Sequence, residues 1–97
     1  NNRLTKNNVN SNYYYGIYLG YSSNNNSLTK NNVNSNSYYG LFVSSGSSSN
    51  TIHFNTFCDS YYDIYNNGAT TGNYNWCDIT YNYHDTGTTT GCNYPCS

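Results

Sequence analysis

Short apolar clusters recur along the chain at a fixed interval of 24 residues, separated by Asn, Ser, Gly and Lys. Residues 4–12 and 28–36 are identical. The first cluster contains Leu4, Leu28, Ile52 and Trp76, and the second contains Val9, Val33, Phe57 and Tyr81. A fixed period of this length predicts a solenoid, in which each repeat packs on its neighbours.

The pattern inside one repeat favours strands. Residues 17–19 and 41–43 alternate at period two, which is typical of a strand with one buried face, and no stretch has the spacing of an amphipathic helix. Each coil is therefore expected to contain three short strands joined by bends. The third copy reaches its last apolar cluster, at residues 62–64, one residue early.

One Asn recurs at the corner between the first two clusters, at Asn7, Asn31 and Asn55. Asn tolerates the left-handed backbone conformation that a sharp corner needs. In stacked coils the amides can also bond to one another along the axis, as Asn ladders do. The sequence therefore predicts a parallel β-helix with a turn ladder at these three positions.

Two other solenoid folds fit the spacing poorly. A leucine-rich repeat needs the pattern Leu-x-x-Leu-x-Leu, which no part of the chain supplies, and a left-handed hexapeptide helix would show a six-residue subperiod.

The pattern Asn-x-Leu-Thr-x-Asn-Asn-Val, followed by Gly-Ile-Tyr-Leu, resembles the repeats of NosD-like and pectate-lyase-type parallel β-helix proteins. The resemblance covers about residues 1–66, and residues 72–76 look like the element that closes such arrays. It implies a right-handed parallel β-helix, here of about four 24-residue coils. Proteins with these repeats include copper-insertion proteins, carbohydrate-active enzymes and surface proteins.

The repeat decays toward the C-terminus, so we divide the single domain into coils one to three (1–72) and a degenerate last coil with a cap (73–97). All four cysteines, Cys58, Cys77, Cys92 and Cys96, lie in the last 40 residues. Their even number and wide spacing indicate two disulfides that stabilise the irregular end. Of the three possible connectivities, Cys58–Cys77 with Cys92–Cys96 keeps the loops most local.

Charge is scarce: charged residues make up 7% of the chain and the net charge is −1. We therefore expect no nucleic-acid partner, and no apolar run is long enough for a membrane span. The abundance of Asn, Ser, Thr and Tyr resembles that of secreted surface proteins, which suggests an extracellular or cell-surface location. Asn25 begins the sole N-glycosylation sequon, which chance also explains in a chain this rich in Asn and Ser.

Candidate chemistry is limited to a few acidic and imidazole groups. Asp59, Asp63, His84 and Asp85 could converge on a cation or act as acid and base. The basic residues that a polysaccharide lyase needs lie in the first two coils, away from these acids, so we expect no enzyme and no cofactor. His53 and Cys77 stand one period apart and could bind copper, but a disulfide at Cys77 would prevent it.

Tyrosines recur at one bend in three successive coils and predict a surface aromatic stripe of Tyr14, Tyr15, Tyr38, Tyr39, Tyr61 and Tyr62. Such a stripe can stabilise the coils, or bind a glycan or another protein. The chain also begins inside a repeat, which leaves an open coil that favours self-association through β-helix ends.

Two functions of different class follow from these observations. The first is a structural extracellular module that stacks end to end, as a fibre subunit or as the C-terminal part of a longer β-helix. The second is a carbohydrate-binding or carbohydrate-processing β-helix. The sequence favours the first.

Overall fold

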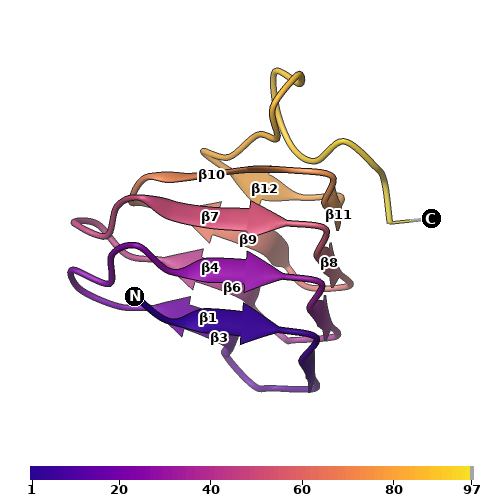
Figure 1. Ribbon diagram of the computed structural model, residues 1–97. Coiled ribbons are helices and arrows are strands. Elements are labelled where there is room, and N and C mark those ends of the chain that lie inside the picture. Colours follow the sequence, from indigo (N-terminus) through magenta and orange to yellow (C-terminus); the bar gives the residue numbers. More distant parts are fainter. Residues whose placement is uncertain (97) are drawn as a thin grey trace.

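The computed structural model describes residues 1–96 and forms a parallel β-helix (Figure 1). Strands of successive coils lie directly above one another in three four-stranded sheets. The first sheet contains β1 (Arg3–Thr5), β4 (Ser27–Thr29), β7 (Asn50–His53) and β10 (Thr70–Asn73); the second contains β2 (Asn8–Asn10), β5 (Asn32–Asn34), β8 (Thr56–Cys58) and β11 (Trp76–Cys77); the third contains β3 (Tyr15–Leu19), β6 (Tyr39–Val43), β9 (Tyr62–Asn66) and β12 (Thr80–Tyr81). Among the described residues, no helix is long and apolar enough to cross a membrane.

The strand register confirms the predicted repeat through the third coil. Leu4 pairs with Leu28 and Leu28 with Ile52, each 24 residues further along the chain. In the third sheet Tyr39 pairs with Tyr62, which is the one-residue shortening expected from the sequence. The regular solenoid therefore has about three turns, with an abbreviated fourth, rather than about four equal coils.

The predicted phase of Trp76 is wrong. Gly72 occupies the place beside Ile52, whereas Trp76 pairs with Thr56 and points outward. Two shortenings produce this shift of four residues. The bend before β9 is one residue shorter than its counterpart in the second coil, and the connection between β9 and β10, residues 67–69, is three residues shorter than residues 44–49. The tightness of the β9–β10 connection is visible at Gly68, where a Cβ atom would lie 2.2 Å from the carbonyl oxygen of Ser47.

The core is a narrow apolar column between the three sheets. It contains one or two inward side chains from each strand of the second and third coils, and these are fully buried: Leu28, Val33, Leu41, Val43, Ile52, Phe57 and Ile64. Tyr83 and Cys77 extend the column into the last turn. In the first coil Ile17 and Leu19 are buried members of the column, whereas Leu4 and Val9 pack against it and are only partly buried. The alternating strand pattern produces this column, because every second residue points inward.

Asn ladders run along three corners of the helix, whereas the sequence predicted one, at Asn7, Asn31 and Asn55. At the middle corner the backbone N–H and Nδ2 of Asn31 both donate to Oδ1 of Asn55, at 2.9 and 3.0 Å. Asn31 Nδ2 also donates to the carbonyl of Leu4 in the preceding coil. The other two ladders begin at Asn2 and Asn12.

The left-handed residue at each middle corner is the one before the ladder Asn, contrary to our expectation. Lys6, Lys30, Phe54 and Tyr74 have φ between 57° and 59°. This backbone turn aims the following Asn into the helix, where its amide bonds to the neighbouring coils. The Asn is therefore selected for its side-chain hydrogen bonds and not for its backbone.

The C-terminal segment lies across the end of the fourth turn as a cap (Figure 1). All four cysteines form disulfides, but the pairs are Cys58–Cys96 and Cys77–Cys92 rather than the local ones we favoured. The chain folds back over the last turn, and β11 forms a bridge to Tyr94. This return places Cys92 and Cys96 next to cysteines far back in the sequence.

Candidate functional site: the aromatic face and the capped end

The aromatic residues form stacks along the outside of the third sheet. One stack contains Tyr15, Tyr39 and Tyr62, with centroid distances of 5.4 and 6.2 Å and interplanar angles of 14° and 9°. A shorter stack joins Tyr14 to Tyr38 at 5.4 Å. All five belong to the stripe predicted from the sequence, and Tyr61 joins it through an edge contact with Tyr62.

A second long stack was missed by the sequence analysis. It consists of Tyr18, Phe42, Tyr65 and Tyr81, with centroid distances of 5.5, 5.3 and 4.4 Å. The signal was available: the first three members lie one coil apart, each between two inward-facing residues. Tyr39 contacts Phe42 edge to face, so the two long stacks form one aromatic face.

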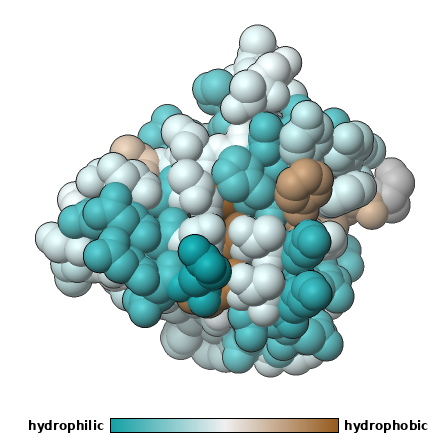
Figure 2. All heavy atoms as spheres, viewed as in Figure 1, coloured by the Kyte–Doolittle hydropathy of each residue, from teal (hydrophilic) through white to brown (hydrophobic). Residues whose placement is uncertain are grey.

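The opposite side of the helix is chemically different. Figure 2 views the molecule with the first sheet in front and shows a mainly hydrophilic surface with small apolar areas. The outward residues of this sheet include Thr29, Thr51 and Thr71. Most of the exposed aromatic rings thus lie on the side of the third sheet, and two separate pairs, Phe54–Tyr74 and Trp76–Tyr94, stack elsewhere.

Asp85, a candidate ligand or catalytic acid, is fully buried and ends the middle Asn ladder. Its carboxylate accepts hydrogen bonds from the backbone N–H and Nδ2 of Asn75, at 3.0 and 2.8 Å. It also accepts from the Tyr83 hydroxyl and from the Asn93 backbone N–H. Burial is the main cause that raises the pKa of Tyr83 well above its ordinary value, and the hydrogen bond to Asp85 raises it further. Asp85 therefore holds the cap.

Asp63 has a similar structural role in the third sheet. It stands where Gly40 stands one coil earlier, and its carboxylate accepts hydrogen bonds from the backbone N–H groups of Ser60, Asp78 and Ile79. Burial raises the pKa of Asp63, while these backbone donors oppose the shift. The side chain connects the third coil to the shortened fourth turn.

The structure does not bring Asp59, Asp63, His84 and Asp85 together. Within residues 1–96, the potential metal ligands that do approach one another are Asp63, Asp78 and Cys96, and the sulfur of Cys96 is in a disulfide. Asp59 occupies an exposed left-handed corner. The carboxylate oxygens of Asp63 and Asp85 accept hydrogen bonds from backbone N–H groups and from the Asn ladder, and they do not converge on an ion.

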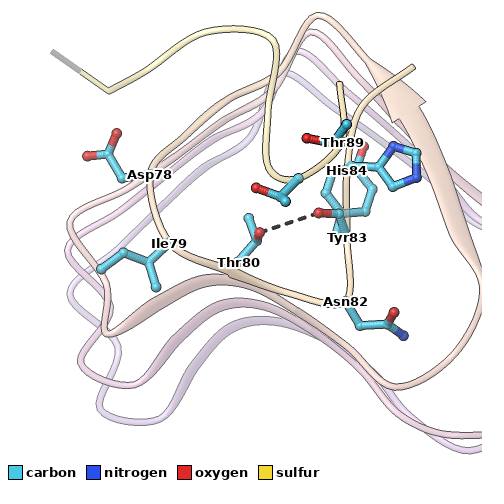
Figure 3. Close-up of a pocket in the computed structure, with 8 residues that line it drawn as sticks. Asp78, Ile79, Thr80, Asn82, Tyr83, His84 and Thr89 are labelled. Carbon is cyan, nitrogen blue, oxygen red and sulfur yellow. Dashed lines mark hydrogen bonds between the residues drawn. The ribbon is translucent and has the colours of Figure 1, made fainter. Parts of the chain in front are cut away.

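An open cleft lies between the last turn and the cap. Its volume is about 520 Å³, and Figure 3 shows Asp78 and Ile79 on one side and His84 on the other. Thr80 Oγ1 donates to the carbonyl of Tyr83 at its floor. The cleft is lined by threonine hydroxyls, the His84 imidazole and one carboxylate, that of Asp78.

Asn25 lies in the loop between β3 and β4, where its side chain is exposed and its φ is 60°. An exposed loop position is accessible to a modifying enzyme, which is compatible with glycosylation. Glycosylation at Asn25 stays a prediction.

The stacked coils, aromatic face and disulfide-clamped end define a parallel β-helix protein of the solenoid class. The profile of the family described as periplasmic copper-binding protein (NosD) matches residues 1–94. The chain therefore belongs to the NosD family. Comparisons with curated proteins and with solved structures give no match. The periplasmic family and the disulfides indicate an extracellular or periplasmic location.

The residues of this chain do not fit a copper centre. Copper prefers imidazole, thiolate and thioether ligands. All four cysteines are in disulfides and the chain has no Met. His53 Nδ1 lies 2.7 Å from Oδ1 of Asn73, and His84 Nδ1 lies 3.1 Å from the Asp85 carbonyl. Cys77 pairs with Phe57 and not with His53, so these two are not axial neighbours.

Proposed function

We propose that the chain is a structural, non-enzymatic β-helix module of an extracytoplasmic protein, and that a further coil of the same kind stacks on β1, β2 and β3. The observation that carries the proposal is the difference between the two ends of the solenoid. One end is covered by the cap, whereas the first coil presents strand edges and apolar side chains. Such an edge is a template for another strand.

Side-chain burial supports stacking at the first coil. Leu28 and Val33 are fully buried between two coils, whereas Leu4 and Val9, their equivalents in the first coil, are only partly buried. A further coil would cover both side chains. Burial of apolar surface contributes roughly 25 cal/mol per Å², so two such side chains account for about 1–3 kcal/mol.

Hydrogen bonding also supports the stacking of a further coil on the first coil. Oδ1 of Asn31 accepts the backbone N–H and the Nδ2 group of Asn7 in the coil before it. Asn7 offers the same acceptor on its outer side. A preceding coil with Asn at this corner would donate two hydrogen bonds to it, each contributing about 1 kcal/mol.

The cap limits how copies can assemble. Head-to-tail stacking into a fibre would bring the first coil of one copy against residues 83–96 of another, where ladder and core are already closed by Asp85 and Tyr83. We therefore favour the role of end module in a longer β-helix over that of fibre subunit. The aromatic rings pack face to face along the axis, which leaves mainly ring edges for a sugar and does not favour the carbohydrate alternative.

Adding one coil tests the proposal. A second copy of residues 4–27, inserted ahead of Leu4 in phase with the repeat, should raise the thermal midpoint by several degrees and extend the β-sheet signal in circular dichroism. A matched insert with Asp at two of its inward positions, those equivalent to Leu4 and Val9, should give no gain. Equal midpoints for the parent and the extended chain would contradict stacking at this face.

A further inference from the structure

Pairs of tyrosines in neighbouring coils are held with their phenol rings nearly parallel. Tyr65 and Tyr81 are register partners, and their ring centroids lie 4.4 Å apart at an angle of 13°. Tyr15 and Tyr39 are also partners, at 5.4 Å and 14°. Because register partners on parallel strands direct their side chains the same way, we expect the two hydroxyls of a stacked pair to point in one direction and the carbons ortho to them to lie close to each other.

We propose that this aromatic face is a site of oxidative dityrosine crosslinking between coils, chiefly at Tyr65–Tyr81 and Tyr15–Tyr39. A one-electron oxidant of the peroxidase class, with hydrogen peroxide, removes one electron and the hydroxyl proton from each phenol. The two radicals join through their ortho carbons, and the ortho hydrogens return to the oxygens. In balance, two tyrosines and one hydrogen peroxide give one dityrosine and two waters.

The exposure of the rings allows this chemistry. Tyr81 is 45% exposed and Tyr15 is 38% exposed, so a small oxidant or a peroxidase surface can reach one member of each pair. The partner ring is already in stacking contact and needs no collision between molecules. Coupling within one molecule is therefore favoured over coupling between molecules at low protein concentration.

The crosslinks would extend covalent closure to coils that the disulfides do not reach. Both disulfides lie in the third coil, fourth turn and cap, whereas Tyr15–Tyr39 joins the first coil to the second. A covalent bond between residues 24 positions apart stabilises mainly by restricting the unfolded chain. The inference concerns the aromatic face and does not depend on what stacks against the first coil.

Phe42 provides an internal control within the second stack. It stacks between Tyr18 and Tyr65 at 5.5 and 5.3 Å, but a ring without a hydroxyl forms no phenoxyl radical. Its presence also shows that the stack accepts Phe, so Tyr→Phe variants should keep the fold. Tyr21, which is 84% exposed and has no stacking partner among the described residues, is a matched control position.

The test treats the dilute full-length chain with a haem peroxidase and hydrogen peroxide, isolates the monomer and maps crosslinked peptides by mass spectrometry. We expect peptides joining Tyr65 to Tyr81 and Tyr15 to Tyr39, each lighter by two hydrogen atoms. Tyr81→Phe should remove the first peptide, Tyr21→Phe should remove neither, and Phe42→Tyr should add peptides joining position 42 to Tyr18 or Tyr65. Crosslinks confined to dimers, or an unchanged monomer pattern in Tyr81→Phe, would overturn the proposal.

Discussion

The second coil and the fourth turn solve the same packing problem with different chemistry. In the second coil Leu28 and Val33 fill the core, and Asn31 passes identical hydrogen bonds from one coil to the next. In the fourth turn Gly72 stands in the position of Leu28, and the ladder ends on the carboxylate of Asp85. Within the repeat, each residue contacts a residue of the same kind in the next coil. At the end of the solenoid there is no next coil, so residues that do not repeat must complete the hydrogen bonds and the core.

The difference follows from hydrogen-bond capacity. An internal ladder residue must accept from the coil before it and donate onward, and an Asn amide does both. The final residue has no following coil to donate to, so an acceptor-only carboxylate suits it. Two disulfides add a covalent constraint where the sheets are shortest, with two residues in each of β11 and β12.

The largest expected effect is a charge in the repetitive core. Val33→Asp places a carboxylate at a fully buried position without a partner, and we expect a loss of more than about 4 kcal/mol in the free energy of unfolding. Val9→Asp, the same change in the partly buried first coil, should cost clearly less. Urea denaturation followed by circular dichroism checks both, and equal costs would mean that the first coil is as closed as the second.

Removal of one disulfide should weaken the end alone. Replacement of Cys77 and Cys92 by Ala opens a link between residues 15 apart, which corresponds to about 3 kcal/mol. In hydrogen exchange, amides of β10, β11 and the cap should lose protection while those of β5 keep theirs. Uniform loss of protection along the chain would show that coils and cap unfold as one unit.

The ladder end and the ladder interior should have opposite residue requirements. Asp85→Asn turns amide hydrogens toward the donors of Asn75 and Asn93 and should cost roughly 2 kcal/mol. The reciprocal change, Asn31→Asp, removes the donor to the Leu4 carbonyl and should cost at least as much. If thermal midpoints show that either position accepts both residues, hydrogen-bond polarity does not select them.

The smallest expected effect is a pH dependence at the capped end. Because folding raises the pKa of Tyr83 above its ordinary 10.0, its neutral form is retained in the folded state when the unfolded chain ionises. The stability linked to Tyr83 is complete below that pH and declines as the pH rises above it. Tyr83→Phe should therefore flatten part of the alkaline decline in the urea midpoint, and an unchanged slope in this variant would contradict the expectation.

The coil architecture could be predicted from the sequence because stacking requires the same residue type at the same phase. The repetition of Asn at positions 7 and 31 predicts a corner, and the repetition of Leu at positions 4 and 28 predicts an inward-facing position. The aromatic face was only half predicted, since Tyr18 and Phe42 repeat in phase but differ in residue type. Repetition is thus a strong signal for contacts between like residues.

The capped end could not be predicted in the same way. The shortened connection after Asn66 shifts Trp76 outward, and no residue before it signals the shift. The fold-back of the chain then decides the partners of Cys58 and Cys77, which spacing alone does not reveal. Asp63 and Asp85 resembled an acidic site because carboxylates that satisfy backbone donors have the same sequence signature as carboxylates that bind ions.

The same Asn-to-Asn hydrogen bonds recur between successive coils, and this repetition affects how the gene for such a protein can gain or lose coils. A duplication of one 24-residue unit between β3 and β4 would meet the same Asn acceptors, apolar positions and ring stacks on both sides. Recombination between the gene segments that encode the identical residues 4–12 and 28–36 would then change the number of coils without disturbing their packing. The last turn contains the residues that do not repeat, such as Asp85 and Cys77. A duplicated copy of this turn inside the solenoid would end the Asn ladder and close the helix early.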